Sequence, residues 1–215
     1  MIASLDGGTS AGGLSGALGG PADKVVFAAL RAAADVILVG AGTMRAEKYG
    51  PARVAPAARE RRTAIGLSPT PPIAVLTSSC RLDWDLPFFT DAESRPLVVT
   101  TAMAEPDDRA RAAEAASVVV AGEQRVDLAR ALAELAALGF SAVLAEGGPT
   151  ILGQLAARGL IDELCLTLSP TLVGGEASRI LDGAVLESIL NADLAHVLES
   201  DGFLFLRYAV GSAPR

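Results

Sequence analysis

The stretch SAVLAEGGPT, from Ser141 to Thr150, joins an apolar run to two glycines and a proline. The run predicts a buried strand, and Pro149 suits the first turn of a helix. The glycines between them form either a tight connection or a site where backbone N–H groups hold an anion. Glu146 stands at the same junction and would aim a carboxylate into such a site. A strand followed at once by a helix indicates an α/β fold.

Similar apolar runs recur along the chain and alternate with helical patterns. They predict strands in DVILVG (35–40), PIAVLT (72–77), PLVVTT (96–101) and SVVVAG (117–122). Helices are predicted after Pro21, after Asp127 with an end at Gly139, and after Pro149 with an end at Gly159. Runs that are apolar on both faces belong to a covered sheet, so we expect a mainly parallel central sheet with helices on both faces.

The C-terminal part follows a different pattern. DELCLTLSPTLVGG (162–175) predicts a strand and a glycine turn. AHVLES and FLFLRYAV, separated by Asp201-Gly202, predict an antiparallel hairpin, because Asp-Gly favours a tight turn. We expect this hairpin to add strands to the parallel sheet. Residues 1–215 would form a single domain, with fraying at 211–215.

The composition argues against several classes of protein. Of 215 residues, 51% are apolar, and the net charge of −7 argues against a nucleic-acid partner. The dense basic run of Arg59, Arg61 and Arg62 lies in the Pro/Ala-rich segment 50–71, which we predict to be a solvated surface loop. No apolar stretch reaches the ~20 residues that cross a bilayer, and no signal peptide is recognisable. We therefore expect a cytoplasmic protein without a membrane partner.

Metal and triad chemistry find little support. Cys80 and Cys165 form no C-x-x-C pair, so we expect reduced thiols and no metal. His196 is the single histidine, lies in a predicted strand and has no G-x-S-x-G partner, so a structural or surface role is expected. P-loop and G-x-G-x-x-G segments are also absent.

Three turns each follow a predicted strand: VGAGTMR (39–45), TSSCR (77–81) and EGGPT (146–150). Ligands bind at this edge of open α/β sheets. Gly40 and Gly42 would let a ligand approach the backbone, and Thr43 would cap the next helix. Each turn is commonplace alone. Together they predict a pocket for an extended, phosphate-bearing cofactor.

The order of segments resembles the reductase domain of the bifunctional riboflavin-biosynthesis deaminase-reductases. The resemblance rests on SLDG (4–7), GLSGALGGPAD (13–23), ADVILVGAGTMRAE (34–47) and AVLAEGGPTILGQLAARGLIDEL (142–164). It implies the dihydrofolate-reductase-like fold and NADPH-dependent reduction of a phosphoribosylamino-pyrimidine, in which the ribose opens to ribityl. It also implies a homodimer, which the long apolar C-terminal strands favour. No deaminase domain is expected, because H-x-E with P-C-x-x-C is absent.

The resemblance further implies a set of cofactor residues. Gly40, Gly42 and Thr43 would line the NADPH. Gly147, Gly148 and Pro149 would hold its diphosphate, with Thr150 beside them, and Ser78 and Ser79 would lie near the adenosine ribose and its 2′-phosphate. Arg45 or Arg81 would supply charge for that phosphate, or face solvent instead.

For the substrate, the matching residues are Asp6, Ser15 and Glu146. The reduction needs a proton from an acid with a pKa near neutral, and a glutamate in an enclosed pocket can meet that need. Glu146 would be this acid or would orient substrate hydroxyls. Asp6 is the other candidate catalytic carboxylate, or it caps its own loop. Lys24 would meet an anionic substrate group or lie on the surface.

Two segments depart from the family pattern. Ala17 stands where the family often has an aromatic residue, and Glu47 to Tyr49 stand where it often has two aspartates and a proline. The leading hypothesis is a reductase of 5-amino-6-(5-phosphoribosylamino)uracil. Because both segments would face the substrate, two alternatives stay open: a reductase of a pterin- or dihydrofolate-like compound, and a non-catalytic NADPH-binding domain.

Overall fold

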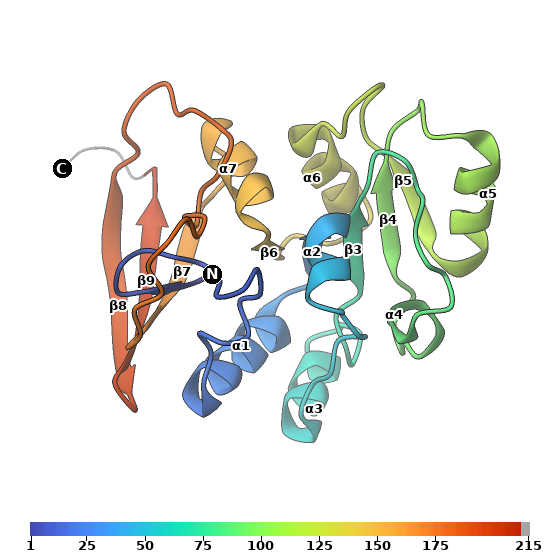
Figure 1. Ribbon diagram of the computed structural model, residues 1–215. Coiled ribbons are helices and arrows are strands. Elements are labelled where there is room, and N and C mark those ends of the chain that lie inside the picture. Colours follow the sequence, from blue (N-terminus) through green and yellow to red (C-terminus); the bar gives the residue numbers. More distant parts are fainter. Residues whose placement is uncertain (212–215) are drawn as a thin grey trace. The chain divides into compact units, whose positions relative to one another are not determined.

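The computed structural model describes residues 1–211, which fall into two compact units. The central unit is Ala28–Glu146. The terminal unit combines Met1–Phe27 with the chain from Gly147 onward. Figure 1 labels the helices and strands of both units. We expected fraying at 211–215, and residues 212–215 lie outside the described range.

A five-stranded sheet forms the middle of the central unit, in the order β5-β4-β3-β2-β6. The strands are β2 (Val36–Gly40), β3 (Ile73–Leu76), β4 (Leu97–Thr100), β5 (Ser117–Val120) and β6 (Val143–Gly147). The pairs β2–β3, β3–β4 and β4–β5 are parallel. Every residue of β2, β3 and β4 is buried, which explains their unbroken apolar sequences. The predicted parallel sheet is confirmed.

The core of this unit lies between the sheet and its helices. Val39, Val75 and Val98, one from each of three adjacent strands, are fully buried and pack in one cluster with Met44 and Phe88. Burying side chains of this size contributes about 1.5–3 kcal/mol each. The core therefore fixes the strands whose ends carry the predicted site.

Six helices accompany these strands within the described residues. They are α1 (Pro21–Ala33), which begins in the terminal unit, α2 (Ala41–Ala46), α3 (Pro56–Ala64), α4 (Pro87–Thr90), α5 (Pro106–Ala115) and α6 (Leu128–Ala137). The helix predicted after Asp127 is confirmed. Asp127 caps it by accepting from the backbone N–H groups of Ala129 and Arg130 at 2.9 and 3.1 Å.

Three local predictions were wrong. The segment 50–71 is not irregular throughout, because Pro56 begins α3 and its alanines and arginines are good helix formers. Arg62 is not solvated: it is 2% exposed, because backbone carbonyls surround its guanidinium. Thr43 does not cap α2, because the helix starts earlier, with Gly40 as the N-cap residue.

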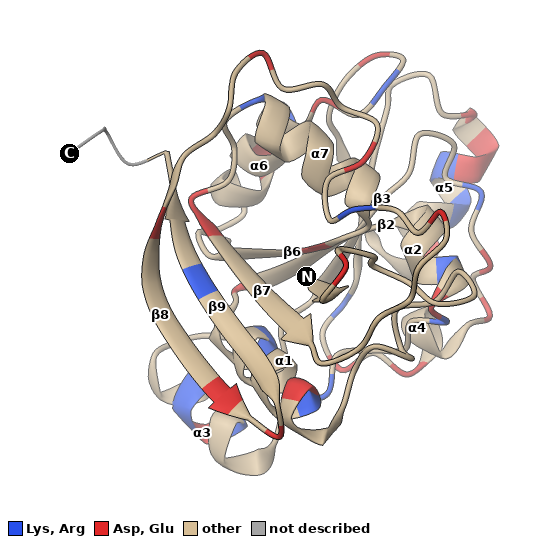
Figure 2. Cartoon of the chain, turned by 60° about the vertical axis from the view of Figure 1, so that its left-hand side comes forward, with Lys and Arg blue, Asp and Glu red and all other residues tan. Residues whose placement is uncertain are grey.

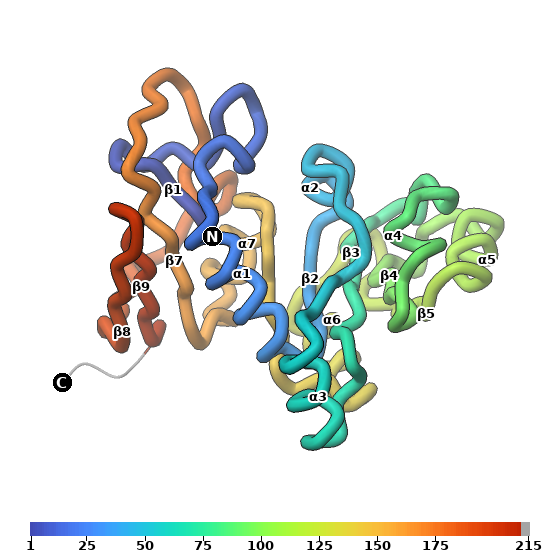
Figure 3. The backbone as a smooth tube through the Cα atoms, turned by 90° about the horizontal axis from the view of Figure 1, so that it is seen from below, coloured from blue at the N-terminus to red at the C-terminus, as the bar shows by residue number. Residues whose placement is uncertain are grey.

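The terminal unit contains a four-stranded sheet in the order β1-β7-β9-β8. Its strands are β1 (Ile2–Ser4), β7 (Glu163–Ser169), β8 (Ala192–Ser200) and β9 (Phe203–Val210), and its further helix is α7 (Pro149–Ala157). The predicted hairpin is confirmed, with positive φ at both turn residues, Asp201 and Gly202. Figure 3 shows β7, β8 and β9 side by side. They form a sheet of their own, because β7 pairs with β1 rather than with the five-stranded sheet.

One face of this sheet is apolar and incompletely buried. The pairing register places on it Leu164, Leu166 and Leu168 of β7, Leu204, Leu206 and Tyr208 of β9, and Leu194 and Val197 of β8, with Glu199 at the end of β8 opposite Leu204. Leu194 is 54% exposed and Val197 45%. The charged residues of β7 and β8 lie toward the strand ends (Figure 2). We call these eight side chains the apolar face.

Two further expectations concern thiols and membranes. Cys80 and Cys165 are free thiols, and burial raises the pKa of both. Along residues 1–211, none of the helices has the length and apolar character that a bilayer crossing requires.

Candidate active site

The predicted ligand turns follow β2, β3 and β6. Gly40 at the end of β2 is the Cα partner of Leu76 at the end of β3, so the turns after these strands are neighbours. Strand β6 lies on the other side of β2. The N–H of Asp35, just before β2, donates to the carbonyl of Ala142, just before β6, at 2.8 Å. Because the two strands start together, their carboxyl ends share one edge, which brings Gly40 and Glu146 to the same side of the sheet.

Helix α2 starts directly after β2. Gly40 is its N-cap residue in an extended conformation, and no side chain caps the first turn. Gly42 is exposed, and a Cβ built on it meets no atom within 4 Å. Thr43 is half-buried within the helix, and Arg45 is exposed in its last turn. The turn therefore presents its backbone at Gly42 and leaves space beside it.

The turn after β3 exposes two serines. Thr77 is buried, and its Oγ1 accepts from the backbone N–H of Ser79 at 3.3 Å. This bond orders the turn while Ser78 and Ser79 stay at the surface. The guanidinium of Arg81 pairs with Asp108 at 3.2 Å, and its side chain is 73% exposed. The hydroxyls are therefore presented on a fixed backbone, whereas Arg81 already has a counter-charge.

Glu146 lies in a buried polar network that joins three segments of the central unit. Its side chain is 3% exposed. Arg31, in the last turn of α1, donates from Nε to Oε1 and from Nη2 to Oε2, both at 2.7 Å. The Tyr49 hydroxyl donates to Oε2 at 2.8 Å, and the Arg31 guanidinium lies 5.5 Å from the centroid of the Tyr49 ring. Three donors thus hold one carboxylate.

Burial and the charge of Glu146 act in the same direction on the pKa of Tyr49 and in opposite directions on the pKa of Arg31. Burial raises the pKa of Tyr49 well above its usual range, and the charge of Glu146 raises it further. Burial alone would lower the pKa of Arg31, but the hydrogen bonds and charge of Glu146 outweigh that effect and raise it. Near neutral pH, Arg31 is therefore a cation and Tyr49 a hydrogen-bond donor, and both donate to the carboxyl group of Glu146.

In the terminal unit, the turn that begins at Gly147 leads into α7. Gly147 has a φ of +93°, a conformation that residues other than glycine rarely adopt. A cis peptide bond joins it to Gly148. Gly148 is the N-cap residue of α7, Pro149 occupies the first turn, and no side chain caps this end. Thr150 is exposed. Because the first N–H groups of a helix lack partners inside it, this turn suits an anion.

Asp6 joins two loops of the terminal unit. It accepts from the Ser4 hydroxyl and from the backbone N–H groups of Val173 and Gly174, the latter two at 3.2 and 2.7 Å. The Ser4 hydroxyl, followed by these backbone groups, lowers the pKa of Asp6 to about 2. Asp6 is therefore ionised near neutral pH, as a loop-capping role requires.

The other predicted substrate residues have simpler surroundings. Ser15 is half-buried, and its carbonyl accepts from the N–H of Leu18 at 2.9 Å. Lys24 is exposed on α1. His196 is exposed on β8. Residues 1–211 contain no group of three or more His, Cys, Asp or Glu side chains that could hold a metal ion.

Sequence reasoning missed Arg31 and used Tyr49 only as a departure from the family pattern. Arg31 looks like an ordinary helix-end cation, and it is 115 residues from Glu146 in the chain. Nothing in its local sequence indicates a buried partner. Tyr49 lies between Lys48 and Gly50, seven residues after Gly42, and its local sequence does not indicate a buried partner either.

Comparison with known proteins confirms the family resemblance that the sequence indicated. A profile of the RibD C-terminal domain family matches residues 1–203. The chain belongs to the RibD C-terminal domain family. One similar member is the 2,5-diamino-6-ribosylamino-4(3H)-pyrimidinone 5′-phosphate reductase of Archaeoglobus fulgidus, 33% identical over 155 residues that cover 72% of this chain and 70% of that protein. The enzyme of the same name from Methanothermobacter thermautotrophicus is 30% identical over 164 residues, 76% of this chain and 72% of that protein.

Solved structures confirm the fold of this RibD C-terminal domain. A pyrimidine reductase-like protein from Corynebacterium diphtheriae superposes with a TM-score of 0.87 at 27% identity, over 99% of this chain and 90% of that one. A dihydrofolate reductase from Enterococcus faecalis gives a TM-score of 0.50 at 11% identity, over 98% and 94% of the two chains. The dihydrofolate-reductase-like fold is therefore confirmed.

Proposed function

We propose that this chain is an NADPH-dependent reductase of a phosphoribosylamino-pyrimidine in riboflavin biosynthesis, acting in the cytoplasm with residues 1–215 as one reductase domain. The carrying observation is its identity of 30–33% to two enzymes named 2,5-diamino-6-ribosylamino-4(3H)-pyrimidinone 5′-phosphate reductase. That name makes the diamino-pyrimidinone the first substrate to test. The uracil expected from the sequence is the second.

Each unit, taken by itself, offers groups that suit one part of a dinucleotide. The start of α7, at Gly147 to Thr150, has no side-chain cap and offers backbone N–H groups to a diphosphate. In the central unit, the open space at Gly42 admits a ligand beside Gly40 and Thr43, and the exposed hydroxyls of Ser78 and Ser79 suit the 2′-phosphate. When bound, NADPH supplies a hydride.

We assign Glu146 the task of orienting a substrate hydroxyl. Oε2 already accepts two hydrogen bonds, whereas Oε1 accepts one, from Arg31. A carboxylate oxygen can accept two hydrogen bonds, so Oε1 keeps one position. The remaining acceptor position on Oε1 suits an O–H donor of a substrate. This favours the orienting role over proton donation.

The test is NADPH oxidation, followed at the nicotinamide absorbance, with each of three substrates: the diamino-pyrimidinone phosphate, the phosphoribosylamino-uracil and dihydrofolate. We expect turnover with the first and at most weak turnover with dihydrofolate. Repeating the assay with NADH measures the cofactor preference. If neither pyrimidine is turned over, the proposed function is wrong.

A second candidate is a reductase of a pterin- or dihydrofolate-like compound. It is favoured by the hydrogen bond from Tyr49 to Glu146, because Tyr49 belongs to a segment that departs from the family pattern. Turnover of dihydrofolate without turnover of the pyrimidines would select it. Tight NADPH binding without turnover of any of the three would select a non-catalytic binding domain.

We also propose a homodimer in which a second copy covers the apolar face of the terminal unit. Its exposed Leu194 and Val197 lie on the edge strand β8, where uncovered apolar surface invites association. The test is sedimentation of Leu194→Asp, which should be monomeric at micromolar concentration. Leu198→Asp is a matched control, because Leu198 is similarly exposed, at 49%, on the opposite face of β8.

A further inference from the structure

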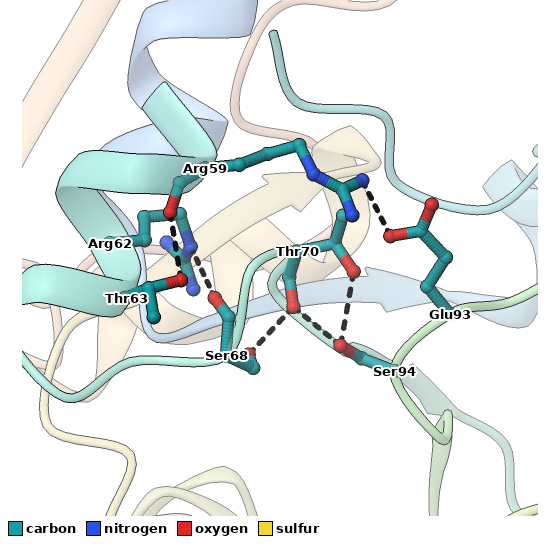
Figure 4. A network of polar contacts seen from close by, with 7 residues as sticks. All are labelled: Arg59, Arg62, Thr63, Ser68, Thr70, Glu93 and Ser94. Carbon is teal, nitrogen blue, oxygen red and sulfur yellow. Dashed lines mark hydrogen bonds and ion pairs between the residues drawn. The ribbon is translucent and has the colours of Figure 1, made fainter. Parts of the chain in front are cut away.

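Arg62 is a buried arginine that binds backbone carbonyls of two segments. It lies in α3 and is 2% exposed. Its Nε donates to the carbonyl of Ser68 at 2.8 Å (Figure 4), and its Nη1 donates to the carbonyls of Ala32, at 2.9 Å, and Ala34. Ala32 belongs to the last turn of α1 and Ala34 follows it, where helix carbonyls lack partners within the helix. Arg62 therefore supplies the cap for the end of α1.

The loop whose Ser68 carbonyl accepts from Arg62 is itself held by hydrogen bonds. Ser68 Oγ donates to the carbonyl of Thr70 at 2.7 Å, and Ser94 Oγ donates to the same carbonyl at 2.6 Å. Arg59, one turn before Arg62 on α3, pairs with Glu93 at 2.6 Å. Figure 4 shows these contacts around the loop that receives Arg62. Helix α3 is thus bound to the segment before β4 as well as to α1.

The other side of the Glu146 network is held by Asp35, whose carboxylate also interacts with the charge of Arg62. Asp35 Oδ2 accepts from the N–H and hydroxyl of Ser141, at 2.8 and 2.9 Å, and from the N–H of Ala142 at 2.8 Å. These two residues lead directly into β6, which carries Glu146. The strand is therefore anchored at its start, and the position of Arg31 depends on the end of α1.

We propose that Arg62 is a positioning residue for Glu146: it fixes the last turn of α1 and thereby the guanidinium of Arg31 that holds the carboxylate. Arg31 immediately precedes Ala32, whose carbonyl Arg62 binds. All of these residues belong to the central unit. The inference rests on the proposed function, because it gives Glu146 a role in orienting the substrate.

The cost of burying Arg62 argues for a positioning role rather than for stability alone. Within residues 1–211, its Nη2 has no hydrogen-bond partner although the atom is buried. Taking a charge out of water is expensive, and an unsatisfied donor adds to that cost. An apolar side chain in the same place would avoid both penalties but could not bind the carbonyls beside Arg31.

The kinetic test compares Arg62→Met and Arg62→Lys with Arg61→Met, whose residue is an exposed arginine of the same helix. We expect Arg62→Met to lower kcat about tenfold or more, because displacing a site group by ~1 Å costs up to about a hundredfold. Arg62→Lys should recover part of the loss, since an ammonium group can still bind a carbonyl. The KM for NADPH should stay within about twofold, and Arg61→Met should match the wild type.

The coupling test adds Arg31→Met. If Arg62 acts through Arg31, Arg62→Met should reduce kcat less than about twofold in that background. An equal loss in both backgrounds would overturn the proposal, because the effect would then be a general structural one.

A measurement without turnover separates this inference from the proposed function. In a Tyr208→Phe background Tyr49 is the single tyrosine, and 3-fluorotyrosine there gives one fluorine NMR line that reports the ring beside Arg31. Arg62→Met should shift or broaden that line, and Arg61→Met should not. If Arg62→Met proves unfolded, Arg62→Lys decides by the same line. An unchanged line in the folded Arg62 variants would refute the positioning role even if the wild type proves inactive.

Discussion

Replacing Arg31 with methionine tests the buried network around Glu146. Methionine can fill much of the space of the arginine stem, but it removes the two hydrogen bonds that the guanidinium donates to Glu146. Glu146 would keep the Tyr49 hydroxyl as donor while its side chain stays 3% exposed. The variant therefore leaves a buried carboxylate without its cation.

The expected magnitude follows from these contacts. Removing one partner of a buried ion pair costs about 3–5 kcal/mol in the free energy of unfolding. Because Arg31 is 16% exposed and Tyr49 keeps its hydrogen bond, the lower end applies, about 3 kcal/mol. Glu146→Gln should cost less, about 1–2 kcal/mol, because the amide oxygen can still accept from Tyr49 and Arg31 retains some contact with water. The double variant should cost less than the sum, by about 1–3 kcal/mol.

The assay is urea unfolding followed by circular dichroism near neutral pH. Arg130→Met is the matched control, because Arg130 forms an exposed helical pair with Glu134 at 3.7 Å. That substitution should cost less than about 0.5 kcal/mol. If Arg31→Met costs less than about 1 kcal/mol, or no more than Arg130→Met, the network does not exist as described.

Three further predictions concern other parts of the site. The folded pKa of Asp6, about 2, lies below its ordinary value of 3.8, so its contribution to stability is full above pH ~4 and is lost as pH falls toward 2. Asp6→Asn should make the urea midpoint of unfolding depend less on pH over that range. An unchanged pH dependence would contradict the contact between Asp6 and the loop. The folded pKa of Tyr49 is raised, so its contribution is full below the unfolded value of about 10 and is lost as pH rises beyond it. Tyr49→Phe should weaken the alkaline loss of stability, and an equally steep loss would count against burial of Tyr49. Gly147→Ala should destabilise by about 1–3 kcal/mol and weaken NADPH binding in calorimetry, whereas Gly139→Ala, at φ +92°, should carry the strain without the binding loss. Equal NADPH affinities in the two variants would remove Gly147 from the cofactor site.

Much of the fold could be predicted because its strands are buried on both faces. β2, β3 and β4 read as apolar runs, and the hairpin was recognisable from Asp201-Gly202. Helix α3 could not be recognised in the same way, because it buries only Ala58 and Arg62 and therefore shows no apolar stripe. The separate four-stranded sheet could not be predicted either, since an apolar pattern indicates a strand but not its partner.

The candidate site was predictable at its turns but not in its supporting contacts. Glu146 could be singled out because it follows a strand and precedes two glycines. Its partners Arg31 and Tyr49 come from 115 and 97 residues away, and no local pattern marks them. Arg62 was misread because its partners are backbone carbonyls, which every residue has, so its burial leaves no trace in the sequence.

The central claim is that this chain reduces a phosphoribosylamino-pyrimidine with NADPH. The most direct measurement incubates the purified protein with NADPH deuterated at its transferable position and 2,5-diamino-6-ribosylamino-4(3H)-pyrimidinone 5′-phosphate, and analyses the product by mass spectrometry. The account predicts a ribityl product that carries the deuterium. An unlabelled or unchanged pyrimidine, recovered from protein that binds NADPH, would contradict it.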